Sequence, residues 1–244
     1  MKLLTLVLCL TGILAHAKQR PNVLFILTDD QAPHTLSVYG NKVCQTPHLD
    51  KLAASGMVLD QAYHMGSMSG AVCSPSRTMI MSGRTLWHLP PRGKKHLKKE
   101  EGKTSGPEIL KNSLPAVFNR AGYETFRTCK NGNSYSLANA LFQVVRDKTA
   151  RKAGEEDGSQ WHGRQVLDYL NARATQKEEK KPFLIYFGFS HPHDERWGRD
   201  DLNEKYGVRN VDAPPTTVSD RAPRVPVSWL PEHPFHHGHV DLRD

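Results

Sequence analysis

The segment CSPSRTMIMSGR places a cysteine where its side chain could do chemistry. Cys73 is followed by Pro75, a residue favoured in the first turn of a helix, and Gly83 is suited to end that helix. A helix through Arg77 to Met81 would direct its positive dipole end and its free N–H groups at the cysteine. With the charge of Arg77 nearby, this environment favours a nucleophile that attacks an anionic ester.

Other interpretations of Cys73 are half of a disulfide, a metal ligand, or a small buried residue. The chain has four cysteines, and Cys9 lies in an N-terminal leader, so that Cys44, Cys73 and Cys129 remain. An odd number of cysteines in an oxidising compartment leaves at least one thiol unpaired. We therefore expect one of the three to have chemistry of its own.

Carboxylates, a lysine and histidines follow three apolar segments of the chain. The polar residues are Asp29 and Asp30 after PNVLFILT, Cys129 and Lys130 after YETFRT, and His191 and His193 after PFLIYFGF. Two adjacent carboxylates are hard oxygen ligands, which suit Ca²⁺ or Mg²⁺ better than zinc. The alternative is that Asp30 caps a turn and Asp29 is solvated.

The elements that carry these residues alternate between strands and helices. The run PNVLFILTDD predicts a strand buried on both faces of a parallel sheet, and YETFRTC and PFLIYFGF predict two more strands. Helices are predicted in TPHLDKLAASGM (N-cap Thr46, end Gly56), in NSLPAVFNRAGY (cap Ser113, end Gly122) and in WHGRQVLDYLNARA. This order predicts an α/β fold with a mostly parallel sheet, whose ligands bind beyond the carboxyl ends of the strands.

Residues 1–17 have the features of a cleaved signal peptide. A positive Lys2 precedes an apolar run from Leu3 to Leu14, and small residues end the segment at Ala17. The run is too short to span a bilayer comfortably, and no other segment approaches membrane length. We therefore expect a secreted or periplasmic protein without a stable membrane anchor.

The composition is that of a globular protein, with 38% hydrophobic and 24% charged residues and a net charge of +8. Part of this charge lies in the Lys-rich segment Arg92–Lys103, for which a solvated loop is favoured over an anion-binding loop. No recognition motif or row of stacking aromatics accompanies this segment, and export would separate the protein from nucleic acid. Nucleic acid is therefore excluded as an expected partner.

The motifs together resemble the type I sulfatases of the alkaline-phosphatase-like superfamily. The segment CSPSRTMIMSGR resembles the family's cysteine-type signature, Cys-x-Pro-Ser-Arg followed by Gly-Arg, and RPNVLFILTDDQ resembles its opening strand with two metal-binding aspartates. TPHLDKLAASGMVLDQAY matches the helix and turn between them, AGYETFRTCK resembles the second signature, and PFLIYFGFSHPHD resembles the later strand with its site histidine. The resemblance covers essentially the whole mature chain, in the family's order.

This resemblance implies a sulfuric-ester hydrolase of alkaline-phosphatase-like fold. A maturation enzyme that recognises Pro75 and Arg77 would oxidise Cys73 to Cα-formylglycine. One hydroxyl of the hydrated aldehyde would attack sulfur, and the second would expel sulfate, which is covalent catalysis with an internal release step. Asp29, Asp30 and the modified residue 73 would bind Ca²⁺ or Mg²⁺.

The same resemblance assigns the sulfate contacts. Arg77 would steady the hydrate, Lys130 would contact the sulfate, and His193 would contact it or protonate the leaving oxygen. His193 is favoured over His191 because the family pattern is Pro-His. The substrate would be a sulfated small molecule or carbohydrate.

The chain departs from the family pattern at the second signature. Where the family has Gly-Lys-x-His, Cys129 replaces the glycine and Gly132 stands at the place of the histidine, with Asn133 as the nearest polar side chain. Ser82 stands where Thr or Ala is more usual.

The C-terminal part of the chain lacks regular patterns. Residues 208–244 are rich in proline and histidine, and the tract HPFHHGH (233–239) favours a polar loop over a metal site. We expect residues 18–244 to be the N-terminal part of a catalytic domain, apparently truncated. The family's second metal pair and a further sulfate-binding lysine would then lie beyond Asp244.

Two other functions fit parts of this pattern. The first is a phosphodiesterase or phosphonate hydrolase of the same superfamily, which would act on another tetrahedral anion. The second is a catalytically inactive, secreted polyanion-binding fragment, which the segment Arg92–Lys103 and the missing ligands favour.

Overall fold

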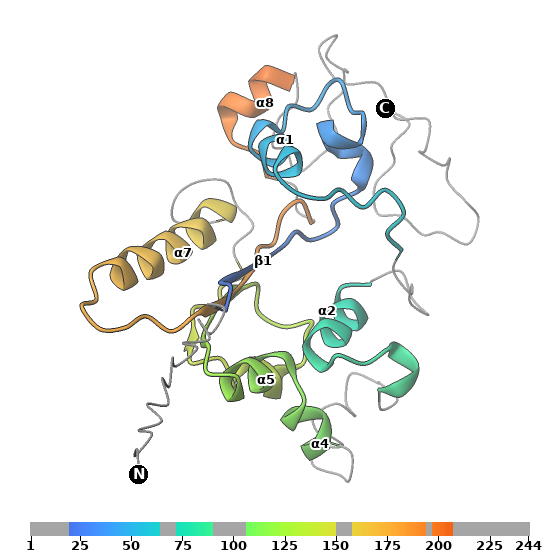
Figure 1. Ribbon diagram of the computed structural model, residues 1–244. Helices are drawn as coiled ribbons and strands as arrows, with labels where there is room; N and C mark the ends of the chain where they lie inside the picture. The colour runs from blue at the N-terminus through green and yellow to red at the C-terminus, as the bar shows by residue number, and fades with distance from the viewer. Residues whose placement is uncertain (1–19, 64–71, 90–105, 150–157, 194–196, 207–244) are drawn as a thin grey trace, which may run out of the picture.

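The computed structural model describes residues 20–63, 72–89, 106–149, 158–193 and 197–206 (Figure 1). The predicted signal peptide (1–17), the basic segment 92–103 and the segment 208–244 with its histidine tract lie outside these residues. Among the described helices, none is long and apolar enough to cross a membrane.

A four-stranded parallel sheet forms the centre of the described fold, as the alternation of strands and helices predicted. Its spatial order is β1-β4-β2-β3, with β1 at Val23–Leu27, β2 at Glu124–Cys129, β3 at Val144–Val145 and β4 at Phe183–Gly188. The strands β1, β2 and β4 lie within the three predicted segments. Because all the strands are parallel, their carboxyl ends share one edge of the sheet.

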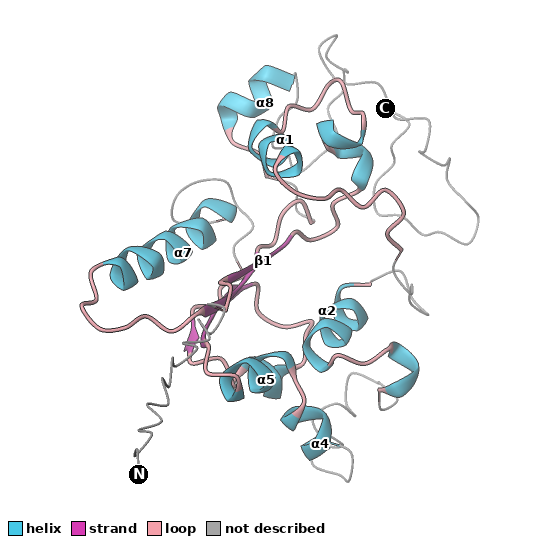
Figure 2. Ribbon diagram, viewed as in Figure 1, coloured by secondary structure: helices cyan, strands magenta, loops and turns pink. Residues whose placement is uncertain are grey.

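Helices lie on both sides of this sheet (Figure 2). They are α1 (Pro47–Ala54), α2 (Cys73–Ser82), α4 (Gly106–Lys111), α5 (Leu114–Arg120), α6 (Ser136–Asn139), α7 (Ser159–Ala174) and α8 (Asp200–Tyr206), with 3₁₀ turns at Pro33–Thr35, Ser37–Tyr39 and Leu86–His88. The sequence patterns did not predict α4, α6, α8 or β3, which are all short. At the top of Figure 1, α1 and α8 lie together, and the N–H of Gln45 donates to the Tyr206 hydroxyl at 3.1 Å.

Alternating side chains of β4 reach two separate apolar cores. Leu184 and Tyr186 belong to the larger core, to which Met81 of α2 contributes, whereas Ile185 packs with Val166 of α7 on the other face. This alternation is the period of two that a strand imposes on its side chains. The central strand is therefore buried on both faces, as its apolar sequence predicted.

The prediction that β1 is also buried on both faces is wrong for the described part of the chain. Leu24 and Ile26 are 48% and 44% exposed. Helix α7 contacts β2 and β4, and no described helix covers the corresponding face of β1. Val23, Phe25 and Leu27, on the opposite face, pack against the larger core.

The predicted helix ends and N-cap positions are largely confirmed, but two of the predicted caps make no side-chain capping bond. Helix α1 starts at Pro47 and α5 ends before Gly122, which has the positive φ of 80° typical of a helix stop. Thr46 and Ser113 occupy the N-cap positions without a side-chain capping bond. Their hydroxyls bond elsewhere: that of Ser113 donates to the Leu110 carbonyl at 2.7 Å.

Candidate active site

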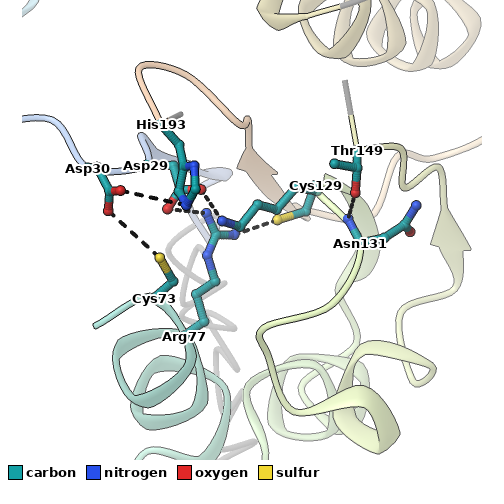
Figure 3. Close-up of polar contacts among 9 residues, drawn as sticks. Asp29, Asp30, Cys73, Arg77, Cys129, Asn131, Thr149 and His193 are labelled. Carbon is teal, nitrogen blue, oxygen red and sulfur yellow. Dashed lines mark hydrogen bonds and ion pairs between the residues drawn. The ribbon is translucent and has the colours of Figure 1, made fainter. Parts of the chain in front are cut away.

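The carboxyl ends of β1, β2 and β4 bring the predicted polar residues together (Figure 3). Backbone hydrogen bonds extend beyond the strands, from Phe189 N–H to Leu27 C=O (3.2 Å), from Asp29 N–H to His191 C=O (3.0 Å) and from Lys130 N–H to Gly188 C=O (3.1 Å). The three strand ends are thus fixed relative to one another, and so are the side chains that follow them.

Helix α2 begins at Cys73, so Pro75 lies in its first turn, as the sequence predicted. The N–H of Ser76 donates to the Val72 carbonyl at 3.0 Å and closes the first turn around Pro75. Proline is tolerated there because the first N–H groups of a helix have no intrahelical partner. Arg77 follows Cys73 by four residues and therefore lies on the same face of the helix.

Asp29 lies between two buried cations. Lys130 Nζ forms an ion pair with Asp29 Oδ2, and Arg77 Nη2 lies 3.6 Å from Asp29 Oδ1. All three residues are at most 3% exposed, and neither Lys130 Nζ nor Asp29 Oδ2 has a further hydrogen-bond partner among the described residues. Charges buried so deeply without full hydrogen bonding are typical of functional sites.

Asp30 faces Cys73 and His193. The thiol of Cys73 donates to Asp30 Oδ1 at 3.7 Å, and His193 Nε2 lies 3.7 Å from Asp30 Oδ2. Asp30 has a positive φ of 60°, a conformation that aspartate adopts more readily than most residues. This turn allows the carboxylates of Asp29 and Asp30, although consecutive in the sequence, both to lie near Cys73.

His193, and not His191, reaches this group of residues, as the sequence favoured. The Nδ1 atom of His191 lies 2.9 Å from the Ser159 hydroxyl at the start of α7. His191 supports the site through its backbone carbonyl, which accepts from Asp29.

The donor atoms fit a hard divalent cation on one condition. Asp29, Cys73 and His193 each offer a ligand atom, and these atoms lie within 4.8 Å of one another, with Asp30 beside them. Carboxylates suit Ca²⁺ and Mg²⁺, whereas a thiol does not. The set fits such a cation when residue 73 presents oxygen in place of sulfur.

The thiol of Cys73 is not activated in this environment. Burial raises its pKa, and the negative charge of Asp29 raises it further. The prediction that the surroundings of Cys73 favour negative charge on its side chain is therefore wrong for the thiol. The reasons are the burial of the thiol and, after it, the nearby carboxylates, neither of which the sequence could indicate.

Cys129 contacts the site, whereas the sequence placed it at a strand end and marked it as a departure from the family signature without giving it a role. Arg77 Nη1 donates to Cys129 Sγ at 2.7 Å, so the guanidinium lies between this thiol and Asp29 (Figure 3). Cys44, Cys73 and Cys129 are all free, so none of the described cysteines forms a disulfide.

The loop after Lys130 does not supply a substitute for the family's histidine. The N–H of Asn131 donates to the Thr149 hydroxyl at 3.1 Å, and Figure 3 shows its side chain directed away from the site. Gly132 and Asn133 are exposed with positive φ, and no described contact joins Asn133 to the site residues. The suggestion that Asn133 reaches the site is not supported.

Ser82 lies at the far end of α2 from the site. Its buried hydroxyl accepts from the Arg84 N–H at 3.3 Å. The departure at this position therefore concerns the end of the helix and not the group of polar residues.

Comparison with known proteins places the chain in a family. Residues 21–221 match the sulfatase family model, and the chain belongs to this family. The N-acetylgalactosamine-6-sulfatase of Canis lupus familiaris is 33% identical over 232 residues, which cover 78% of this chain and 43% of that enzyme.

Solved structures support the fold. A 2-O GAG sulfatase is 20% identical with a TM-score of 0.50 over 83% of this chain and 42% of that chain. The protein Ps i-CgsB, in complex with k-i-k-neocarrahexaose, is 18% identical with a TM-score of 0.56 over 79% and 50% of the two chains. The alkaline-phosphatase-like α/β fold is thus confirmed, and the chain spans half or less of the length of these relatives.

Proposed function

We propose that the protein hydrolyses sulfate esters at the site formed by Asp29, Asp30, Cys73, Arg77, Lys130 and His193. The observation that carries the proposal is the pair of buried cations, Arg77 and Lys130, which flank a carboxylate beside Cys73 in a chain of the sulfatase family. A sulfate ester is a tetrahedral anion whose negative charge moves toward the leaving oxygen as the bond breaks. Fixed cations in a buried site stabilise that charge without reorganisation during the reaction.

Residue 73 provides the nucleophile after its oxidation to Cα-formylglycine by a maturation enzyme of the host. The raised pKa of the Cys73 thiol supports this step, because an unmodified thiol would remain protonated and weakly nucleophilic near neutral pH. The formylglycine hydrate supplies one hydroxyl for attack on sulfur and a second for release of sulfate. Asp30, which already lies against Cys73, orients the side chain at this position.

Asp29 and Asp30, with the oxidised residue 73, are the residues that would hold Ca²⁺ or Mg²⁺. The cation supplies positive charge beside the nucleophile and the sulfate oxygens. Lys130 Nζ pairs with Asp29 in the structure, and it would contact a sulfate oxygen if Asp29 held the cation. Both roles keep the lysine neutralised at every stage, which its burial requires.

His193 and Arg77 complete the set of proposed roles. His193 Nε2 lies at the edge of the group and is partly exposed, so it can hold a proton for the leaving oxygen of the alcohol. Arg77 is fixed by its buried contacts and steadies the nucleophile one helical turn away. Catalysis of this kind depends mainly on positioning and on charge neutralisation.

Sulfated carbohydrates are the proposed substrate class, and an exported enzyme is the proposed setting. The support for the substrate class is the similarity of this chain to two proteins. The canine relative is an N-acetylgalactosamine-6-sulfatase, and the structure of Ps i-CgsB contains k-i-k-neocarrahexaose. The support for export to a periplasm or the outside is the leader pattern of residues 1–17.

Parallel ester assays test this proposal. The full-length protein, co-expressed with a formylglycine-generating enzyme, is assayed on aryl sulfate and aryl phosphate and on sulfated oligosaccharides. We expect sulfate release that disappears in Cys73→Ala and that exceeds phosphate release. Faster phosphate release would contradict the proposal in favour of a phosphoesterase, and salt-sensitive polysaccharide binding without release of either anion would favour the polyanion-binding function.

A further inference from the structure

We infer that Cys129 is a positioning residue that orients the Arg77 guanidinium, and that Gly188 is required to leave room for its thiol. This inference rests on the proposed function, because its consequence is the rate of sulfate ester hydrolysis. The family signature has glycine at the position of Cys129, so the thiol is a feature of this chain.

The contacts of Arg77 carry the first step. Its side chain is 2% exposed and makes two contacts at opposite sides of the guanidinium: Nη1 to Cys129 Sγ at 2.7 Å and Nη2 to Asp29 Oδ1 at 3.6 Å. The guanidinium is planar, so a contact that fixes one nitrogen also fixes the direction of the other. Of the two, only the contact with Cys129 is a hydrogen bond, because Nη2 has no hydrogen-bond partner among the described residues, and so the thiol is the group that orients the guanidinium.

The second step is the space in which the thiol lies. Cys129 and Gly188 are paired across β2 and β4 at the ends of these strands. A Cβ atom added to Gly188 would lie 2.7 Å from Cys129 Sγ, 3.2 Å from Tyr186 Cε1 and 3.3 Å from Arg77 Nη1. A side chain at position 188 would thus displace both the sulfur and the guanidinium. Residues 129 and 188 are therefore complementary: the Cys129 thiol occupies the space that the missing side chain of Gly188 leaves free.

The third step connects this geometry to the reaction. Arg77 lies one helical turn from Cys73, and its Nη2 faces Asp29, a proposed cation ligand. Without the sulfur, Nη1 loses its acceptor in a buried place and the long side chain gains rotamer freedom. A small displacement of a positioned charge reduces the rate of the chemical step more than it reduces substrate binding.

The test compares Cys129→Ala, Cys129→Ser and a matched control, Cys44→Ala, in the full-length protein. Cys44 is a free cysteine that no proposed role involves. The formylglycine content of each protein is measured by mass spectrometry, and kcat is expressed per converted site. We expect Cys129→Ala to lower kcat about 10-fold with KM changed less than about twofold, Cys129→Ser to recover most of the loss because its hydroxyl accepts from Nη1, and Cys44→Ala to match wild type.

A second measurement tests the complementary pair through stability. Gly188→Ala is introduced into wild type and into Cys129→Gly, and the unfolding midpoint in urea is measured for all four proteins. We expect the added methyl to lower the midpoint clearly in the wild-type background and much less where the sulfur is absent.

The outcomes separate this inference from the proposed function. If wild type hydrolyses sulfate esters but Cys129→Ala turns over as fast as Cys44→Ala, or Cys129→Ser is as slow as Cys129→Ala, the inference alone is overturned. A loss of stability in Cys129→Ala with kcat per converted site unchanged would also overturn it, because the thiol would then only fill space. If wild type releases no sulfate from any ester, the proposed function fails first and the inference falls with it.

Discussion

Acidification should destabilise this fold through His162, a buried histidine on α7. His162 is 0% exposed, and its Nδ1 lies 2.7 Å from the Thr128 hydroxyl on β2. Burial lowers the pKa of His162 from 6.5 to about 4. The histidine is therefore neutral in the folded protein at pH values where it is already protonated in the unfolded chain.

The sign and the size of the effect follow from this difference. Between pH 6.5 and about 4 the unfolded chain binds more protons, so the free energy of unfolding rises with pH. The contribution is fully present above pH 6.5 and is lost as the pH falls toward 4. The difference between a pKa of 6.5 in the unfolded chain and about 4 in the folded protein corresponds to a loss of about 3 kcal/mol in the free energy of unfolding.

Urea unfolding at pH values from 7 to 4 measures this loss, with His162→Gln as the comparison because glutamine does not titrate. Burial raises the pKa of Asp147, an effect of opposite sign in which folding becomes more favourable as the pH falls. That effect is common to both proteins, so their difference isolates His162. The reasoning is refuted if the difference in unfolding free energy between wild type and His162→Gln stays constant across this range.

Two further predictions concern the charges at the site. Lys130→Met should lower the unfolding free energy by about 3 kcal/mol or more in calcium-free buffer, because it leaves the buried Asp29 with Arg77 as its remaining cation. Calcium should restore part of this loss, which chemical denaturation with and without calcium measures. Asp30→Asn should reduce the calcium-dependent rise in Tm. It should change the calcium-free unfolding free energy by no more than about 0.5 kcal/mol, because the Asp30 side chain is exposed. An unchanged rise in Tm with calcium would exclude Asp30 as a ligand.

Much of this fold follows from local sequence patterns. The apolar runs predicted β1, β2 and β4, and proline near the start and glycine after the end predicted α1 and α5. The alternation of these strands and helices predicted the parallel sheet and the edge at which polar residues collect. The exposure of Leu24 and Ile26 could not be predicted, because it depends on which helix covers which strand. Two-residue β3 and one-turn α6 are too short for a periodic pattern.

The site was predictable in its residues but not in its contacts. The types and order of Asp29, Cys73, Lys130 and His193 identified them, and parallel strands bring their elements to one edge. That Cys129 would accept from Arg77 could not be inferred, because the contact depends on how α2 lies across β2 and on the small residue opposite. The raised pKa of the Cys73 thiol could not be predicted either, because it depends first on the burial of the thiol and then on its distance to two carboxylates, whereas the sequence indicates only the direction of the helix.

The chemical identity of residue 73 tests the central claim most directly. The full-length protein is produced together with a formylglycine-generating enzyme, and the peptide that contains residue 73 is weighed by mass spectrometry. The account predicts a peptide lighter than the cysteine form by the difference between a thiomethyl and an aldehyde group, about 18 Da. Unmodified cysteine at residue 73 in a preparation that releases sulfate would contradict the account, because the nucleophile would then have to be another group.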